Sequence, residues 1–512
     1  MSTSIANLGR EPNRFVLEPP TRATIAVVTA AAASAGAVGI PVFADGKTPK
    51  NLGVAREGLR AAGFSAELGA ALAIPQAKGP LLIAVGLGQP SELDASRVRD
   101  AAAAFARSAS AQVHLAFSLE DIGGLPAEGA AQAAIEGMLL ARHEYPGFGR
   151  PQKTKPVETI ALIANPDQER AARSGAERGQ AYATATILAR DLANTPHSHL
   201  TATQLGEIAR ELGNSNGFEV EVFAAEALAN LGCGGLLGVN AGSVEPPCMI
   251  KLTYRPQGPS SGRLALVGKG IMYDSGGISL KPNDNVHARM KNDMSGAAAV
   301  LAAVAELPEL DCPTTVTGYL MCTDNMPSGT AQALGDVITT HGGRTVEVNN
   351  TDAEGRLVMC DALAMAAEEH HEAIIDIATL TGSVMRALGP DIAGLLGNDE
   401  ALIEQVKRAA AATGELVWQL PLHRPYRKAL DSDVALMKNA GRTGSVEPDG
   451  IVASLYLSEF VGDTPWAHVD ICGTAWNDAD RLWRRAGCSG FGARLLVELA
   501  MRFEPGVRQT RH

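Results

Sequence analysis

Two carboxylates and a guanidinium stand close together in the stretch NNTDAEGRL, residues 349–357. Asp352 and Glu354 are separated by one residue, and Arg356 follows after one more. The preceding TVEV alternates like a strand and the following VMCDALAMAAEEH has a helix-like composition, so the stretch is predicted to join a strand to a helix. Residues two apart on an extended segment point to the same side. We therefore expect both carboxylates to reach one centre, with Arg356 on the same side.

A second polar cluster lies within VGKGIMYDSGGISLKPNDNVHARMKNDMSGAAAV, residues 267–300. It holds Lys269, Asp274, Lys281 and Asp293, and the glycines between them let the backbone approach a ligand closely. Carboxylates gathered from both clusters would raise one another's pKa unless cations compensate, and two divalent ions would balance four such charges. An oxygen-rich set without a Cys or His pattern suits Mg, Mn or a carboxylate-bound Zn pair.

Each acid could instead be a helix cap or a surface charge, and for Asp293 or Asp352 taken alone this explanation is as good as a metal ligand. The joint occurrence of both clusters, with glycines and two lysines interleaved, favours a metal site over this structural explanation.

Strands and helices alternate around the two clusters. Buried strands are predicted at 264–270, 316–323, 373–379 and 467–473, and helices at 294–307, 450–461 and 491–503. The alternation predicts an α/β sheet with helices on both faces, in which ligand sites gather beyond the carboxyl ends of the strands.

The 512 residues are too many for one ordinary core, so two domains are expected. A basic, proline-punctuated stretch at 150–158 precedes a long helix predicted over 168–196. We place an N-terminal α/β domain at 1–165, a linker helix at 166–190, and a C-terminal domain with both polar clusters at 191–512.

Composition narrows the class of protein. Hydrophobic residues at 46% and charged residues at 20% are typical of a soluble globular protein. The net charge of -12 makes nucleic acid an unfavoured partner without excluding it. Seven scattered cysteines fit a reducing compartment, and the membrane-like stretch 24–40 is too short and too rich in Ala and Gly for a span. A cytoplasmic protein with no membrane association is expected.

Three segments resemble signatures of the leucyl aminopeptidase family, the cytosol aminopeptidases: NTDAEGRL, GKGIMYDSGGISLKP, and DNMPSGTAQALGDV at 324–337. Supporting matches are RDLANTP, AGSVEPP, DIATLTG, SDVALMKN and WAHVDICGTAW. The resemblance covers roughly 190–495. It implies a smaller N-terminal α/β domain, a larger C-terminal catalytic α/β domain with a mixed sheet flanked by helices, and a homohexamer.

The resemblance also implies roles for single residues. Asp274 and Glu354 would bridge two metal ions; Asp352 would complete the more exchangeable site, and Lys269 with Asp293 the tighter one. In a catalytic role, Lys281 would stand over the scissile carbonyl and Arg356 would hold a bicarbonate ion. Residues that match the pocket for the substrate's first side chain are Met290, Thr379 and Gly382.

The implied activity is a two-metal-dependent aminopeptidase that hydrolyses the N-terminal bond of peptide substrates and prefers Leu-like first residues. The metals would be Mn or Zn, with Mg or Co as alternatives, and a metal-bridging water would be the nucleophile. Two other readings are a DNA-binding scaffold, disfavoured by the acidic balance, and a two-metal phosphatase or nuclease, which leaves Lys269 unexplained.

The chain departs from the family pattern at one place. It has one residue more between Asp274 and Asp293, so either a loop bulges and Asp293 stays the ligand, or Asn292 takes the ligand position. The pattern MKND followed by MSGAAAV favours Asp293, because loops absorb single insertions at little entropic cost.

Overall fold

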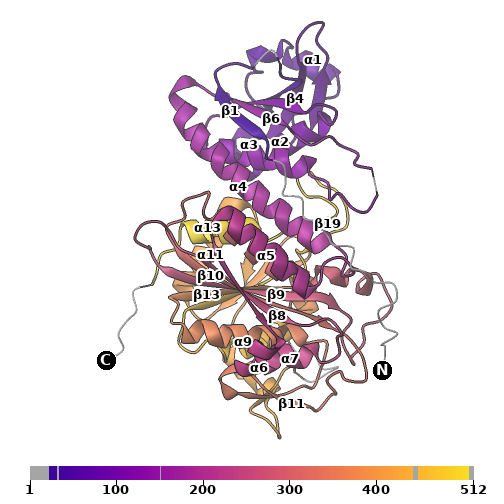
Figure 1. Ribbon diagram of the computed structural model, residues 1–512. Coiled ribbons are helices and arrows are strands. Elements are labelled where there is room, and N and C mark those ends of the chain that lie inside the picture. The colour runs from indigo at the N-terminus through magenta and orange to yellow at the C-terminus, as the bar shows by residue number, and fades with distance from the viewer. Residues whose placement is uncertain (1–21, 32–33, 121, 150, 442–447, 507–512) are drawn as a thin grey trace.

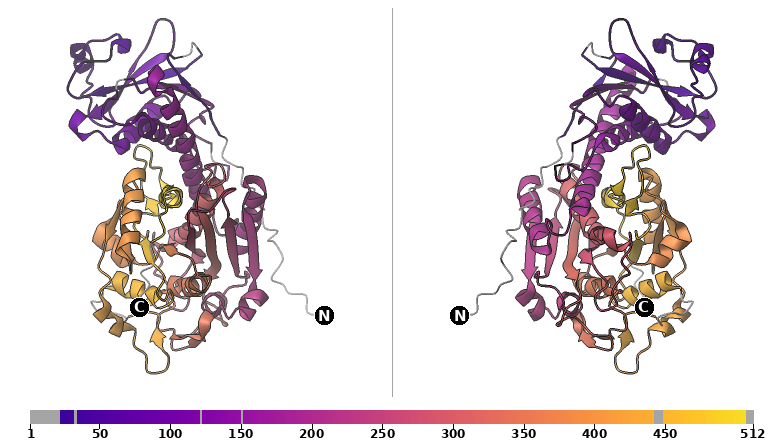
Figure 2. Two further views of the ribbon diagram at one scale, coloured as in Figure 1. Left: turned by 90° about the vertical axis from the view of Figure 1, so that its left-hand side faces the viewer. Right: turned by 90° about the vertical axis from the view of Figure 1, so that its right-hand side faces the viewer.

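The computed structural model describes residues 22–31, 34–120, 122–149, 151–441 and 448–506. A smaller N-terminal domain and a larger C-terminal domain are joined by the long helix α4 (Glu169–Asn194), which runs from one into the other (Figures 1 and 2). Each domain is an α/β unit with its own sheet, and the sheet of the larger domain is mixed and flanked by helices. The predicted fold class is confirmed.

The N-terminal sheet has the strand order β1-β6-β5-β2-β4-β3 and is parallel except for β3. Its strands are β1 (Thr24–Val28), β2 (Ala37–Phe43), β3 (Ala71–Ile74), β4 (Leu81–Gly88), β5 (His114–Ser118) and β6 (Thr159–Ile163). Its helices are α1 (Arg56–Ala61), α2 (Ala95–Ser108) and α3 (Ala127–Arg142). Strand β2, with the sequence AVGIPVF, begins inside the stretch 24–40 that the composition excluded as a membrane span.

The C-terminal sheet has the order β15-β14-β17-β13-β9-β10-β8-β7. The four strands predicted here are its parallel centre: β9 (Arg263–Asp274), β10 (Thr315–Asn325), β13 (Ala373–Ala378) and β17 (Trp466–Asp470). The outer strands are β7 (Glu219–Ala224), β8 (Cys248–Tyr254), β14 (Ala393–Gly397) and β15 (Val417–Gln419). Strand β8 is antiparallel to both β10 and β7, and β14 is antiparallel to β17.

Helices cover both faces of this sheet and form separate cores with it (Figure 1). One face carries α5 (Ala202–Asn216), α8 (Ser295–Glu306), α11 (Glu400–Thr413) and α13 (Ala493–Met501). The other carries α6 (Ala225–Asn230), α7 (Gly234–Asn240), α9 (Glu354–Glu368) and α12 (Asp449–Ser458). Smaller elements are α10 (Gly382–Leu388), the sheet of β11 (Val337–Thr339), β12 (Thr345–Glu347) and β16 (Met437–Lys438), and the pair β18 (Trp476–Asn477) and β19 (Gly487–Cys488). Among helices within the described ranges, none is both long and apolar enough to cross a membrane.

Helix α4 belongs to the cores of both domains. Ala172 and Ala176 pack in the N-terminal core, whereas Leu188 and Leu192 pack in the C-terminal one. Between these two groups, the Tyr182 hydroxyl donates a 2.6 Å hydrogen bond to Glu498 of α13. The helix is therefore a shared structural element and not only a connection.

A buried ion cluster also joins the domains. The Glu136 carboxylate on α3 accepts hydrogen bonds from Arg99 Nε on α2 at 2.7 Å and from Arg494 Nη1 on α13 at 2.6 Å. All three side chains are almost completely buried. Burial alone would raise the pKa of Glu136, but the two guanidinium groups outweigh it and hold that pKa below its ordinary value. The carboxylate thus remains charged between two buried cations.

We expect Glu136→Ala to lower the free energy of unfolding by about 3–5 kcal/mol, because it removes the carboxylate that pairs with two buried guanidinium groups and leaves Arg494 only the more distant Glu415, at 3.7 Å. Chemical denaturation measures this loss. The control is Glu169→Gln, which removes the exposed ion pair with Arg173 and should cost less than about 1 kcal/mol. Equal, small losses in both variants would contradict the structural role given to Glu136.

Candidate metal centre

The site lies where β9 ends. Asp274 is the last residue of that strand, at a point where the register with β10 shifts and Asn325 becomes its partner. The Asn325 amide donates a 2.8 Å hydrogen bond to Asp274 Oδ1, and the backbone N–H of Gly276 donates another at 2.9 Å. One carboxylate oxygen is thereby fixed, and Oδ2 stays available to other groups.

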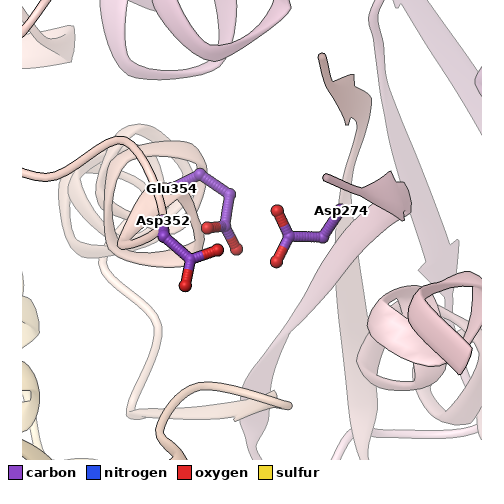
Figure 3. A group of neighbouring side chains, drawn as sticks. All are labelled: Asp274, Asp352 and Glu354. Carbon is purple, nitrogen blue, oxygen red and sulfur yellow. The ribbon is translucent and has the colours of Figure 1, made fainter. Parts of the chain in front are cut away.

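Asp352 and Glu354 approach Asp274 from the opposite side, beside α9 (Figure 3). Oxygen atoms of the three carboxylates lie within 4.8 Å of one another. The expected reason for this convergence is wrong. Strand β12 ends at Glu347 and belongs to the small sheet, Asp352 lies in a turn, and Glu354 is already the first residue of α9. The two carboxylates converge because the chain turns into a helix, not because they alternate along a strand.

Lys269, in the middle of β9, crosses toward the start of α9. Its Nζ lies 2.6 Å from Glu354 Oε1 and 2.9 Å from Asp293 Oδ2, and it donates a 2.9 Å hydrogen bond to the carbonyl of Thr379. A Cβ atom on Gly355 would stand 2.8 Å from Lys269 Cε, so a larger residue there would displace the lysine. Glycine in the first turn of α9 is what allows this close approach.

Lys281 occupies the other side of the cluster. Its Nζ lies 2.7 Å from Asp274 Oδ2 and 2.5 Å from Asp352 Oδ1. The two lysines therefore contact all four carboxylates expected at the site, Asp274, Asp293, Asp352 and Glu354. Since four carboxylates face two ammonium groups, the cluster still lacks positive charge.

The pKa values reflect this crowding. Burial, followed by repulsion from Asp274 and Glu354, raises the pKa of Asp352 to about 6. Burial also raises the pKa of Asp293 well above its ordinary value, although Lys269 opposes the shift. The pKa of Glu354 is lowered, because the two lysines outweigh the effect of burial. The residues thus form one coupled electrostatic unit.

The donor set fits divalent metal ions. Glu354 Oε2 is buried and has no hydrogen-bond partner among the described residues, although a buried carboxylate oxygen normally has one. It stands in a group of three carboxylates close enough to share an ion. Oxygen ligands of this kind suit Mn, Mg or carboxylate-bound Zn. Lys269 could ligate an ion only as a neutral amine. Without an ion, the surrounding carboxylates raise the pKa of Lys269 despite its burial. A metal ion would therefore have to displace the proton of this ammonium group.

Asp293 and not Asn292 presents its side chain to this cluster. Asp293 Oδ1 accepts a 2.7 Å hydrogen bond from the Thr379 hydroxyl while Oδ2 faces Lys269. Asn292 is buried beside it, and its carbonyl accepts a hydrogen bond from Ser295. These contacts favour Asp293 over Asn292 at the ligand position, and the role of Asp293 as a ligand stays a prediction.

We expect Asp293→Asn to weaken the tighter metal site by more than about 100-fold, because a ligand should matter at least as much as the residues behind it. Asn292→Ala should leave the affinity nearly unchanged. Isothermal titration calorimetry of each metal-free variant with Mn²⁺ measures the two affinities. The reverse order of effects would assign the ligand position to Asn292.

Arg356 turns away from the carboxylates. Its Nη1 donates to the carbonyl of Asn439 at 3.0 Å, and its Nη2 lies 2.5 Å from Asp449 Oδ1. The expectation that it continues along the same side as Asp352 and Glu354 is therefore wrong. Helical geometry carries its side chain around α9 to α12 instead.

The three residues expected to bind the substrate's first side chain lie in two segments of the chain, one at 379–382 and one at 287–294. Thr379 follows β13 and contacts both Lys269 and Asp293, as described above. Gly382 begins α10, and Met290 lies half-buried in the 3-10 helix His287–Met294 that also carries Asp293. Their roles in substrate binding remain predictions.

Two asparagines that the sequence analysis passed over organise the site. Asn325 ties Asp274 to the 349–353 loop, since its amide also donates to the Thr351 carbonyl at 2.9 Å. Asn439 holds the same loop by donating to the Asn350 carbonyl at 2.7 Å and accepting from the Asn349 N–H at 3.0 Å. Both asparagines lie in segments that resemble the family, DNMPSG and VALMKN. This resemblance was the one feature of the sequence that could have indicated their importance.

The fold and the site together define a two-domain α/β protein with a carboxylate- and lysine-lined metal centre. Family models match both parts: the catalytic domain of the cytosol aminopeptidase family at residues 187–497, and the N-terminal domain of that family at 43–152. The chain belongs to the cytosol aminopeptidase family, as the sequence motifs indicated, and is a metal-dependent aminopeptidase and hydrolase on that basis.

Similar proteins agree with this assignment. A probable cytosol aminopeptidase from Roseiflexus castenholzii is 42% identical over 81% of this chain and 86% of that protein. One from Synechococcus sp. is 42% identical over 82% and 84%. Among solved structures, the bottromycin maturation enzyme BotP in complex with Mn is 37% identical, has a TM-score of 0.83, and covers 91% of this chain and 99% of its own.

Proposed function

We propose that this protein is a two-metal aminopeptidase that removes the N-terminal residue of peptides, with a preference for Leu-like first residues. The observation that carries the proposal is the convergence of Asp274, Asp352 and Glu354 within 4.8 Å, with one buried oxygen of Glu354 lacking a hydrogen-bond partner. Such a set can hold two ions if Asp293 and Lys269 add ligands at its inner end.

The positions of the side chains support the proposed ligand roles. Asp274 and Glu354 face each other across the cluster and would be shared between the ions (Figure 3). Asp352 is the most exposed of the four carboxylates and would hold the more exchangeable ion, whereas Lys269 and Asp293 are buried and would hold the tighter one. When bound, the ions would supply an activated water and polarise the substrate carbonyl.

The remaining lysine acts on the substrate. Lys281 is the more exposed of the two and contacts the outer carboxylates, so its ammonium group can donate to the scissile carbonyl oxygen as negative charge develops there. Thr379, Gly382 and Met290 would line the pocket for the first side chain. The free α-amine of the substrate would bind at the metal centre, which restricts cleavage to the N-terminal bond.

The proposal is tested with Leu-p-nitroanilide and its N-acetylated form. Only the free amine should be cleaved, a chelator should abolish the activity, and Mn²⁺ or Zn²⁺ should restore it, with Mg²⁺ and Co²⁺ as comparisons. Mn²⁺ is the first ion to test because the similar BotP structure contains Mn. Cleavage of the acetylated substrate at a similar rate would rule out an aminopeptidase. An intermediate of bottromycin maturation belongs in the same substrate panel.

We further propose a cytoplasmic homohexamer for which nucleic acid is an unfavoured partner. Light scattering at micromolar concentration should give six times the mass of one chain, and a gel shift with duplex DNA should show no binding at physiological salt, because the net charge of -12 opposes it. A monomer, or saturable DNA binding, would contradict these assignments separately.

A further inference from the structure

The chain between β13 and α10 lies directly against the inner end of the metal centre. The Thr379 carbonyl accepts a 2.9 Å hydrogen bond from Lys269, and the Thr379 hydroxyl donates one of 2.7 Å to Asp293. Both partners are proposed ligands of the tighter ion. A residue that fixes the segment 379–382 therefore also fixes the two ligands at this end of the centre.

Asp470 holds this segment in place. It is the last residue of β17 and pairs with Ala378, the last residue of β13, so it lies where the chain leaves the sheet. Asp470 Oδ1 accepts a 3.2 Å hydrogen bond from the Leu380 N–H, and Oδ2 accepts one of 2.7 Å from the Thr381 hydroxyl. Two consecutive residues of the segment are thus bound to one carboxylate.

The Asp470 carboxylate is also held from its own strand. Its Oδ1 accepts a further hydrogen bond from the Cys472 N–H at 3.0 Å, and only 1% of Asp470 is exposed. The Ile471 N–H donates to the Ala378 carbonyl at 2.8 Å, which continues the pairing of β13 and β17 beyond Asp470. A buried carboxylate whose oxygens are all hydrogen-bonded is a fixed link between the two chain segments.

A buried histidine supports the charge of Asp470. Trp466, His468 and Asp470 alternate along β17 and point to the same face. His468 Nδ1 contacts Asp376 on β13, and the Trp466 indole donates a 2.6 Å hydrogen bond to the same carboxylate. Burial lowers the pKa of His468, but Asp376 and Asp470 outweigh burial and raise this pKa above its ordinary value. A protonated imidazole beside Asp470 favours the charged carboxylate within the core.

From these contacts we propose that Asp470 is a positioning residue for the tighter metal ion. It anchors the segment 379–382 to β17 and thereby keeps Thr379 where it orients Lys269 and Asp293. The inference rests on the proposed two-metal function. The more exchangeable ion is assigned to the outer carboxylates and should depend on Asp470 much less.

Isothermal titration calorimetry of the metal-free protein with Mn²⁺ tests this selectivity. Asp470→Ala should weaken the tighter ion by about 10- to 100-fold, the usual effect of losing a residue that orients a metal ligand, and should leave the other affinity nearly unchanged. Thr381→Val removes the hydroxyl that Asp470 accepts and should give the same selectivity with a smaller effect. Thr381→Ser keeps the hydroxyl and should bind both ions as wild type does. Thr381→Val leaves the buried charges intact, so it carries the test alone if Asp470→Ala does not fold.

A double variant shows whether the two residues act together. If Thr381 acts through Asp470, the combination of Asp470→Ala with Thr381→Val should bind the tighter ion no more weakly than Asp470→Ala alone. Thr381 is also the N-cap residue of α10. If the double variant instead shows the product of the two separate fold-changes, Thr381 acts only through that cap, and the proposed link is overturned.

Asp361→Asn is the matched control for a general loss of packing. Asp361 is also buried, and its carboxylate holds two backbone segments by accepting 2.9 Å hydrogen bonds from the N–H groups of Leu236 and His341. This variant should be less stable than wild type but should bind both Mn²⁺ ions with unchanged affinity. An equal weakening of the tighter ion here would show that the centre responds to any buried substitution, and would overturn the assignment.

Cleavage of Leu-p-nitroanilide gives a second readout that separates the two proposals. With Asp470→Ala, the Mn²⁺ concentration that gives half-maximal kcat should rise in proportion to the Kd of the tighter ion, and excess Mn²⁺ should restore kcat by mass action. A wild type that binds fewer than two ions or does not cleave this substrate overturns the proposed function itself. An active wild type together with an Asp470→Ala variant of unchanged Mn²⁺ affinities overturns the role of Asp470 and leaves the aminopeptidase function standing.

Discussion

Glu354→Gln should abolish turnover and remove metal from both positions while the fold survives. Glu354 belongs to the group of three carboxylates, and its Oε1 also lies 2.6 Å from Lys269, so its loss would remove a ligand that both proposed ions share. Glutamine fills the same space, and Lys269 keeps Asp293 as its counterion. Loss of activity should be at least about a thousandfold, because Lewis-acid stabilisation is worth several kcal/mol. Elemental analysis per subunit and a steady-state assay measure the two effects.

A control for this variant lies on the same helix. Glu368→Gln, at the far end of α9, removes an exposed carboxylate that pairs with His341 and should change neither metal content nor activity. If Glu354→Gln retains two ions per subunit and near-normal activity, the bridging assignment is wrong.

Lys281→Ala should lower kcat by about 100- to 1,000-fold, the usual effect of removing one donor to a developing oxyanion. Metal content should stay the same, because the ligands proposed for the ions do not include this lysine. KM should change little, since an interaction that strengthens in the transition state affects kcat and kcat/KM alike. Steady-state kinetics and elemental analysis of the same preparation provide both readouts.

Lys428→Ala is the control for that variant. It removes an exposed lysine in the segment Arg424–Leu430, far from the cluster in sequence, and should change neither kcat nor metal content. Loss of metal from Lys281→Ala, or a rise in KM alone, would show that Lys281 helps to assemble the centre or to bind substrate in its ground state.

The sequence predicted the parallel centre of the larger sheet because β9, β10, β13 and β17 are nearly continuous apolar runs, as buried parallel strands are. It also predicted a strand at TVEV, which is β12, but the short alternating pattern of this strand is the same whether it joins the large sheet or the small one. Periodicity reports burial on one face but not the identity of the neighbouring strand.

The acids and lysines of the site were predictable because charged residues at strand ends and helix starts are conspicuous. Asn325 and Asn439 were missed because a neutral amide gives no charge signal, although each makes several hydrogen bonds that hold the site together. Asp449 gave no usable signal either. An aspartate that begins a helix has a sufficient local explanation, and its pairing with Arg356, 93 positions away in the chain, depends on the tertiary fold.

Helix α4 and the ion cluster of Glu136 limit how this chain can exchange parts with its relatives. The match to the N-terminal domain ends at residue 152, and the match to the catalytic domain begins at 187. The contacts that join the two domains are not confined to this interval, because Glu136 and Arg494 lie outside it. In a chimeric protein whose first 152 residues come from a relative, the relative supplies the residue at the position of Glu136. Arg494 stays buried and charged, so that residue must be able to pair with it. An exchange of the N-terminal domain would therefore require matched residues in α3, α4 and α13.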